Sequence, residues 1–325
     1  MSKQNLEYNL EMVEPRDWHA KAVEMSLQGK SSSDIAEALL GRRTQGSTVR
    51  DFLRKVSISK AALEVENKEL KILYWDIETL PSVSAHWGQW GQNISKGKKI
   101  REGHMLSHAW AWGDGEVQSS ILTPQEVINA DDSRIVYEMW SLFDQADVIV
   151  AHNGRKFDIK KAKTSFILHG LVPPSPYKVV DTLSIAKRNF AFPFNNLDYL
   201  CEVLGVEFRK VENSGEKLWM SCLAGDPESL KLMREYNEGD IPTLRALYKK
   251  LRAWDTDGVN LGLFVEGEDK CLCPNCASDN LEKIGGKTAK TPNNVYDVYR
   301  CKDCKAISRS VTSISGSKNN LVKVV

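Results

Sequence analysis

The sequence predicts an α/β fold for the middle of the chain, with a small all-α domain before it and a compact cysteine-rich domain after it. Apolar, β-favouring runs at residues 70–80 and 147–151 and helical spacing over residues 227–251 are typical of a sheet covered by helices. Residues 17–56 show only short helical patterns, and five of the seven cysteines follow residue 270.

Length and composition agree with several domains. A chain of 325 residues with 42% apolar content can bury a sizeable core and suggests two or three domains. We expect a first domain at residues 1–60, a linker at 61–69, the α/β domain at 70–255, and the cysteine-rich domain with a tail at 256–325. No run of eighteen apolar residues and no basic-then-apolar leader occurs, which predicts a cytoplasmic protein without a membrane partner, in bacteria or, if phage-encoded, in the host.

Residues 17–56 are expected to form three short helices, broken at residues 29–30 and 41–46. The third helix has an apolar face at helical spacing, and its opposite side would expose Arg50, Arg54 and Lys55. Residues 42–60 hold six basic residues and one acidic residue, which favours contact with phosphates. The arrangement resembles a helix-turn-helix domain that binds DNA; a three-helix bundle with a basic last helix is also a common protein-docking shape.

Residues 70–80, LKILYWDIETL, are predicted to form a strand that carries two carboxylates. Because residues two apart share one face of a strand, Asp76 and Glu78 would point to one side while Ile77 points into the protein. Taken alone, an Asp-x-Glu pair is more often a solvated face or a capped turn than a catalytic pair. Beside so apolar a strand, however, the two charges would be an unexplained cost, which favours a functional site.

Residues 147–158, DVIVAHNGRKFD, predict a short apolar strand and then a basic helix that begins near Lys156. Asp158 would lie in the first turn or two of that helix. An acid at this place also complements the helix dipole, so Asp158 by itself supports a structural and a functional interpretation equally.

Residues 227–251 show helical spacing on both sides of Pro242. Tyr236 and Asp240 are four residues apart and therefore share a helical face. Since proline removes a helical hydrogen bond, we expect the helix to kink or to restart just after Asp240. A break there could re-aim Asp240, but proline at a helix restart is also common in packing alone.

Together the three stretches read Asp-x-Glu, Asn-x-x-x-Phe-Asp and Tyr-x-x-x-Asp, in that order. The pattern resembles the 3′-to-5′ exonucleases of the DEDD superfamily, tyrosine subtype. It is similar above all to the proofreading domain of family B DNA polymerases and to stand-alone exonucleases of that shape. The resemblance covers roughly residues 68–255 and implies an RNase H-like fold, a mixed sheet flanked by helices.

The resemblance also implies a role for each matching residue. Two divalent cations, Mg²⁺ or Mn²⁺, would be held by Asp76, Glu78, Asp158 and Asp240. Tyr236 would orient the attacking water. Thr79 and Leu80 match positions that contact the terminal nucleotide, Asn153 matches a substrate-facing position and Phe157 a packing position, and we group all four with the substrate-binding residues. The pattern assigns no role to His152, which we interpret as structural.

Five cysteines cluster near the end of the chain, in CLCPNC at residues 271–276 and CKDC at residues 301–304. Two Cys-x-x-Cys pairs can each present two thiolates to one tetrahedral Zn²⁺, and the expected ligands are Cys273, Cys276, Cys301 and Cys304. The segment resembles a zinc ribbon. A reducing compartment favours the metal over disulfides. Whether Cys271 joins the site stays open, and the ribbon is either a nucleic-acid module, which its basic residues favour, or a structural appendage.

Charge is distributed unevenly along the chain. Basic residues outnumber acidic ones by 10 to 8 in residues 1–60 and by 10 to 4 in residues 270–325, whereas residues 61–269 hold 24 basic and 31 acidic residues. Basic modules on both sides of an acidic core suit a polyanionic ligand.

We therefore predict a metal-dependent 3′-5′ exonuclease that acts on DNA in phage or bacterial replication or repair, with proteins of those processes as further partners. Two alternatives remain. The same carboxylates could serve an RNA exonuclease, because no residue reports contacts to a 2′-hydroxyl. The chain could also be an inactive DNA-binding or assembly protein on a nuclease fold, although an inactive site has no need of clustered negative charge.

Overall fold

The computed structural model describes residues 18, 21–22, 25–26, 30–52, 70–88, 90–206, 215–265 and 270–316. Tertiary contacts divide the chain into two compact units, one made of residues 1–69 with 265–269 and the other of residues 70–264 with 270–325. Among the described residues, no helix has the length and apolar character needed to cross a membrane.

The described part of the first unit is helical. It contains α3 (Ser32–Leu40), a 3₁₀ turn η1 (Arg43–Gln45) and a helical stretch over residues 46–52. The Ser31 hydroxyl caps α3 by accepting a hydrogen bond from the Asp34 backbone N–H at 3.2 Å. A small core gathers Ala22, Ile35, Ala36, Val49 and Phe52. Arg50 is exposed, whereas the predicted DNA-contact residues Arg54 and Lys55 lie outside the described residues.

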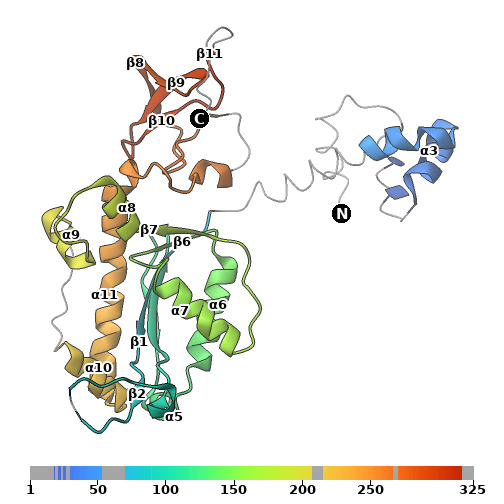
Figure 1. Ribbon diagram of the computed structural model, residues 1–325. Helices are drawn as coiled ribbons and strands as arrows, with labels where there is room; N and C mark the ends of the chain where they lie inside the picture. Colours follow the sequence, from blue (N-terminus) through green and yellow to red (C-terminus); the bar gives the residue numbers. More distant parts are fainter. Residues whose placement is uncertain are drawn as a thin grey trace. The chain divides into compact units, whose positions relative to one another are not determined.

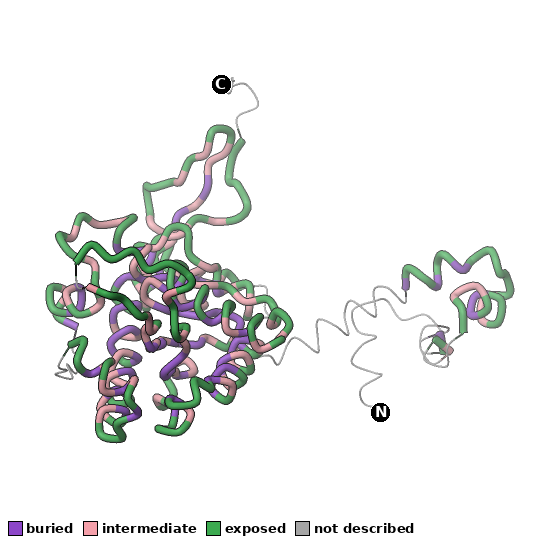
Figure 2. The backbone as a smooth tube through the Cα atoms, turned by 60° about the horizontal axis from the view of Figure 1, so that its bottom comes forward, coloured by how far each residue is buried: buried purple, intermediate pink, exposed green. Residues whose placement is uncertain are grey.

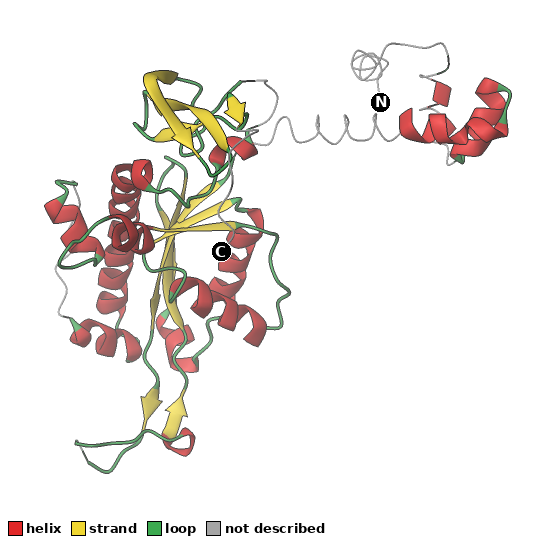
Figure 3. Ribbon diagram, turned by 45° about the horizontal axis from the view of Figure 1, so that its top comes forward, coloured by secondary structure: helices red, strands yellow, loops and turns green. Residues whose placement is uncertain are grey.

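A five-stranded mixed sheet forms the centre of the second unit (Figure 3). Its strands are β1 (Ile72–Thr79), β4 (Met105–Trp112), β5 (Gln118–Ile121), β6 (Val148–Ala151) and β7 (Lys178–Asp181). The order is β5-β4-β1-β6-β7; β1 pairs antiparallel with β4 and parallel with β6. The predicted mixed sheet is thereby confirmed.

Helices cover both faces of this sheet (Figure 1). One face carries α6 (Ser133–Gln145) and α7 (Asp158–Leu168), and the other carries α8 (Thr182–Asn189), α9 (Leu197–Val203) and α11 (Pro227–Leu251). The shorter elements are α5 (Pro124–Asn129), α10 (Glu216–Leu223), η3 (Arg252–Trp254) and η4 (Leu261–Phe264). The helices thus cover the sheet on both sides, and Figure 2 shows buried residues in the interior of this domain with exposed residues around them.

The side chains of β1 alternate between two cores. Leu73, Trp75 and Ile77 belong to the cluster that includes Met139 and Phe143 of α6. Tyr74 belongs to the cluster built with α11. Because the period of a strand is two, the even-numbered positions that follow Tyr74 must face α11 as well.

Helix α11 runs through Pro242 without ending. Of the two outcomes expected just after Asp240, a kink or a restart, the restart does not occur. The reason is packing: Ile241, Leu244 and Leu247 are fully buried or nearly so against the sheet, and burial of that apolar stripe offsets the hydrogen bond that proline removes.

A two-stranded ribbon extends β1 and β4 beyond the main sheet (Figure 3). Strand β2 (Val83–Ser84) pairs with β3 (Lys99–Arg101), and a 3₁₀ turn η2 (Lys96–Lys98) precedes β3. The C-terminal residues form a second sheet in which β9 (Asn294–Cys301) pairs with β8 (Leu281–Lys290), β10 (Ile307–Arg309) and β11 (Ser315–Gly316).

Candidate active site

Carboxylates from β1 and α11 lie together on the α11 face of the sheet. Asp76 and Glu78 follow Tyr74 at the period of two, and Tyr74 packs in the core built with α11. Candidate ligand oxygens of Asp76, Glu78 and Asp240 all lie within 4.8 Å of one another. The structure therefore brings the first and third acidic stretches together, although they are more than 150 residues apart in the sequence.

A tightly held turn shapes the second acidic stretch. Asn153 adopts a left-handed conformation with φ of 62°, which asparagine tolerates better than most residues. The Asp181 carboxylate accepts hydrogen bonds from the backbone N–H groups of Asn153 at 3.0 Å and of Arg155 at 3.1 Å. A Cβ on Gly154 would lie 2.5 Å from the Cβ of Ala151. Only glycine fits there, so the Asn-Gly pair fixes the path of the chain into α7.

Asp158 begins α7 directly after this turn, two residues later than the start that we expected near Lys156. Its side chain is buried, and the backbone N–H groups of Asp158 itself and of Ile77 partly offset the rise that burial causes in its pKa. Ile77 lies between the two acids of β1. Asp158 is outside the group whose ligand atoms lie within 4.8 Å, but its charge raises the pKa of both Asp76 and Glu78.

Burial holds the pKa values of all four carboxyls above their ordinary range, and repulsion within the cluster adds to this effect for Asp76 and Glu78. Burial, followed by repulsion from Asp240 and Asp158, raises the pKa of Glu78 to about 8. Burial raises the pKa of Asp158 and of Asp240 to about 7, and the pKa of Asp76 well above its ordinary value. Such a cluster favours the charged form only when cations are close. The donor set fits hard divalent cations, which bind carboxylate oxygens.

Tyr236 and Trp219 border the same cluster. Burial and the charges of Asp240 and Glu78 raise the pKa of Tyr236, so that its phenol stays protonated. The indole N–H of Trp219, on α10, favours the charged form of Glu78 and lowers its pKa against the effect of burial. The rings of Trp219 and Tyr236 meet edge to face with centroids 6.1 Å apart. Trp219 was not predicted from the sequence, because nothing local in α10 relates it to β1.

Asn237 is a second residue that sequence reasoning missed. It is fully buried; its amide donates to the Asp76 carboxylate at 2.8 Å, and its amide oxygen accepts from the Ser107 hydroxyl at 2.9 Å. The signal was present in the sequence, since Asn237 lies four residues after Met233 and four before Ile241, within the apolar stripe of α11. A polar residue in such a stripe needs a partner, and here the partner is a carboxylate of the cluster.

The predicted substrate-binding residues differ in exposure. Leu80 is only 2% exposed and belongs to the core, so its side chain offers almost no surface to a nucleotide. Thr79 and Asn153 are half-buried. Phe157 is 41% exposed and lies 5.7 Å from the Lys161 ammonium; it is therefore not a core residue, contrary to the packing position that the resemblance suggested.

His152 makes two hydrogen bonds inside the fold. Its Nδ1 lies 2.8 Å from the Thr182 hydroxyl and its Nε2 lies 2.9 Å from the Asn195 carbonyl. Burial lowers its pKa. These contacts agree with the structural interpretation of His152.

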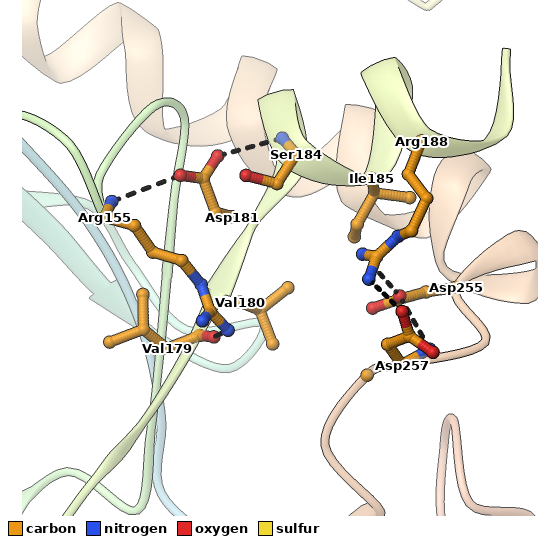
Figure 4. Close-up of a pocket in the computed structure, with 10 residues that line it drawn as sticks. Arg155, Val179, Val180, Asp181, Ser184, Ile185, Arg188, Asp255 and Asp257 are labelled. Atoms are coloured by element: carbon orange, nitrogen blue, oxygen red, sulfur yellow. Dashed lines mark hydrogen bonds and ion pairs between the residues drawn. The ribbon is translucent and has the colours of Figure 1, made fainter.

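A cavity of about 240 Å³ lies behind the Asn153 turn (Figure 4). Asp181 and Arg155 line one side, and Arg188 lines the other, where it pairs with Asp255 and Asp257 at 3.2 and 2.6 Å. These acids neutralise Arg188, and the Arg155 guanidinium donates a hydrogen bond to the Val179 carbonyl. The residues of this cavity hold the turn in place.

The four predicted zinc ligands come together beside the C-terminal sheet, where Cys301 ends β9 and the other three lie in turns or loops. All four sulfurs lie within 4.8 Å of one another, and they belong to Cys273, Cys276, Cys301 and Cys304. Two of the sulfur-sulfur distances are 3.5 and 3.6 Å, near the roughly 3.8 Å that four Zn–S bonds of about 2.3 Å at tetrahedral angles require. Burial raises the pKa of the Cys301 thiol, but backbone N–H groups of Cys304 and Asp303 outweigh it and lower the pKa to about 7. Cys271 is exposed and outside the group.

Comparisons with known proteins agree with the fold. Residues 102–252, a little under half of the chain, match the family model described as RNase_H superfamily. The match includes Asp158 and Asp240 but begins after Asp76 and Glu78. Together with the mixed sheet flanked by helices, it shows that the α/β domain is RNase H-like.

Among solved structures, the chain is similar to the family B DNA polymerase from the hyperthermophilic archaeon Pyrobaculum calidifontis, with 17% identity and a TM-score of 0.42 over 71% of this chain. The chain spans only 34% of that polymerase. Comparison with curated proteins finds no match.

Proposed function

We propose that the protein is a metal-dependent 3′-5′ exonuclease that hydrolyses DNA from its 3′ end. The observation that carries the proposal is the convergence of the half-buried carboxylates of Asp76, Glu78 and Asp240. The buried Asp158 lies close enough to raise the pKa of Asp76 and Glu78, and the pKa values of all four carboxyls are raised. An RNase H-like fold without a ligand would gain nothing from such repulsion. The order and spacing of the three motifs support the exonuclease reaction and its direction.

The proposal assigns metal binding to the four carboxylates and orientation of the attacking water to Tyr236. Asp76, Glu78, Asp158 and Asp240 would hold two divalent cations, Mg²⁺ or Mn²⁺. When bound, such ions lower the pKa of water and neutralise charge on the phosphate and on the leaving oxygen. Tyr236, which keeps its proton, would donate a hydrogen bond that orients the attacking water. The water oxygen attacks phosphorus and the bond to the 3′ oxygen breaks, which leaves a 3′-hydroxyl on the strand and releases a 5′-monophosphate.

The flanking modules are proposed to bind the rest of the nucleic acid. Arg50, Arg54 and Lys55 of the N-terminal domain would contact phosphates, and so would the basic C-terminal ribbon, which we propose is held by one structural Zn²⁺ on the four cysteines. The cysteine geometry supports the zinc. Since metal and folding are coupled in domains this small, the zinc would act on stability and not on the chemical step.

The proposal is tested with single-stranded DNA and RNA labelled at the 5′ or the 3′ end. With Mg²⁺ or Mn²⁺ we expect a ladder of 5′-labelled products that shortens one nucleotide at a time, and immediate loss of a 3′ label as mononucleotide. Preference for DNA over RNA is read from the same gels. Asp76→Asn should abolish the ladder.

The matched control is Glu238→Gln. Glu238 lies on α11 two residues before Asp240, but it bonds to Ser119 and Arg234 instead of the cluster, so this variant should cleave as the wild type does. If Asp76→Asn and the wild type were equally active, the carboxylate assignment would be wrong. If the wild type cleaved neither DNA nor RNA with any divalent cation, the protein would be the inactive binding or assembly protein instead.

A further inference from the structure

Two highly exposed tryptophans lie in the loop between β2 and β3, on the segment that follows β1. Within residues 81–103, here called the hairpin segment, Trp87 is 100% exposed and Trp90 is 88% exposed. Ile94 and Ile100 are 56% and 70% exposed on the same segment. A large aromatic ring that buries almost no surface contributes almost nothing to the fold. The two indoles are therefore available to a ligand.

Hydrogen bonds within the segment shape the backbone around the two rings. The His86 imidazole lies 2.7 Å from the Gly88 carbonyl, and the Gln92 amide donates to the Trp90 carbonyl at 3.0 Å. At the base of the segment, the Ala85 backbone N–H donates to the Lys98 carbonyl at 2.8 Å. The tryptophans thus project from a loop with its own internal bonding.

The hairpin segment is basic within an acidic domain. It holds four basic residues and one acidic residue, whereas the rest of residues 61–269 holds 20 basic and 30 acidic residues. Lys99 pairs with Glu102 at 2.8 Å, and Arg101 donates to the Val127 carbonyl at 3.2 Å. Among the residues that the structure describes, Lys96 and Lys98 take part in no ion pair. The Lys98 ammonium donates to the Asn93 carbonyl at 3.1 Å, which leaves its charge uncompensated and two of its protons for an anion.

The segment is joined directly to the carboxylate strand. Leu80 donates its backbone N–H to the His104 carbonyl at 2.9 Å, and a Cβ on Gly103 would lie 2.6 Å from the Leu80 carbonyl oxygen. This close approach fixes the base of the hairpin against the end of β1. Nine residues separate Glu78 from Trp87, so their Cα atoms are at most about 30 Å apart. A strand of about nine stacked nucleotides, at about 3.4 Å each, covers that upper limit.

We propose that the hairpin segment binds single-stranded nucleic acid, with unpaired bases stacked on Trp87 and Trp90 and phosphates paired with Lys96 and Lys98. The inference rests on the proposed function for the class of substrate and extends it to the strand outside the active site. Aromatic rings interleaved with lysines match single strands, whose bases present open faces. In a duplex those faces are covered by neighbouring base pairs, and a protein partner would not require the uncompensated positive charge.

The test separates stacking from apolar contact. In an Asp240→Asn background, without divalent cation so that the strand stays intact, the affinity for a labelled single strand of about 15 nucleotides is measured by fluorescence anisotropy. Changing both Trp87 and Trp90 to Leu keeps apolar side chains but removes the rings, and should weaken binding at least about tenfold. Changing both to Phe should cost less than about threefold. Trp254→Leu, which removes another largely exposed tryptophan outside the segment, should bind as the parent does.

Kinetic measurements on the double Leu variant without the Asp240→Asn substitution test whether the two tryptophans act outside the active site. The double Leu variant should raise KM for the long strand and leave kcat for a dinucleotide unchanged, because a dinucleotide does not extend beyond the carboxylate cluster. Equal affinity of the Leu and parent proteins, or equal losses in the Leu and Phe variants, would overturn the inference. If the protein cleaved nothing but its binding depended on the two tryptophans, the hairpin proposal would be supported and the proposed nuclease function contradicted. If the protein cleaved the strand and the double Leu variant bound it as the parent does, the nuclease function would be supported and the hairpin proposal contradicted.

Discussion

Asp158→Asn should make the metal-free protein more stable while it abolishes hydrolysis. The substitution keeps the shape of the side chain and removes one of the mutually repelling charges. Asp158 is buried, and burial is the largest cause of its raised pKa. The same change also relieves Asp76 and Glu78, because both are repelled by Asp158.

The magnitude follows from the pKa of the buried carboxyl. Folding raises it from 3.8 to about 7, and about three pKa units at about 1.36 kcal/mol each correspond to about 4 kcal/mol. A carboxyl with a raised folded-state pKa contributes full stability below its unfolded value and loses it as pH rises through the folded value. The wild type should therefore lose stability between about pH 4 and pH 7. Asp158→Asn should keep the corresponding free energy of unfolding, because its side chain does not titrate.

Calorimetry without divalent cation measures the effect. At pH 8 the transition of the α/β domain should lie about 10 °C higher in Asp158→Asn than in the wild type, since about 1 kcal/mol shifts the midpoint of a domain of this size by roughly 2–4 °C. At pH 4 the two should nearly coincide. Saturating Mg²⁺ should narrow the gap at pH 8, because it stabilises the wild type by roughly 3 kcal/mol at about a hundred times its dissociation constant. An equal or lower midpoint for the variant at pH 8, or a gap independent of pH, would refute the electrostatic reasoning.

Three further substitutions separate the roles assigned to residues of the carboxylate cluster and of the C-terminal zinc ribbon. Tyr236→Phe should lower kcat by about 10²-fold or more, as loss of a proton-positioning group does, with an unchanged Mn²⁺ titration; weakened Mn²⁺ binding would instead make Tyr236 a ligand. Asn237→Leu removes the amide that donates to Asp76 and should reduce metal affinity about 10- to 100-fold. Ser107→Ala should have a smaller effect, because Ser107 bonds to Asn237 and not to the cluster; equal losses of metal affinity would show general damage to the core. Elemental analysis should find one zinc per chain in the wild type and none in Cys276→Ser, and the variant should lower the unfolding midpoint of the C-terminal zinc ribbon. Cleavage of a dinucleotide should continue; its loss would contradict a purely structural zinc.

Local periodicity is sufficient to predict much of the site. A strand has a period of two, so the sequence alone assigns Asp76 and Glu78 to one face, and the four-residue spacing of Tyr236 and Asp240 does the same for α11. The mixed sheet flanked by helices is confirmed. Cys-x-x-Cys pairs are equally local, which is why the four cysteines that converge are the four that were expected.

Predictions that depended on long-range packing fared worse. The proline rule allowed a kink or a restart near Asp240, and the buried stripe of α11 keeps the helix continuous through Pro242, without a restart. The core encloses the side chain of Leu80, and its contact with the terminal nucleotide stays a prediction. At Pro242 a local preference was outweighed by apolar burial, whose energy depends on residues far along the chain.

The sequence by itself determined which residue types occur at which local spacing, and so it determined the chemistry of the site: carboxylates for hard cations and thiolates for zinc. Only the tertiary structure decided which side chains support that chemistry. Asn237 and Ser107 meet at Asp76, and Trp219 meets Glu78, across 130 to 161 residues. Likewise, only the structure shows that Trp87 and Trp90 are left exposed on the segment that follows β1. The physical reason is that spacing along the chain fixes the direction of a side chain within one element, whereas contacts between elements and burial depend on how the whole chain packs.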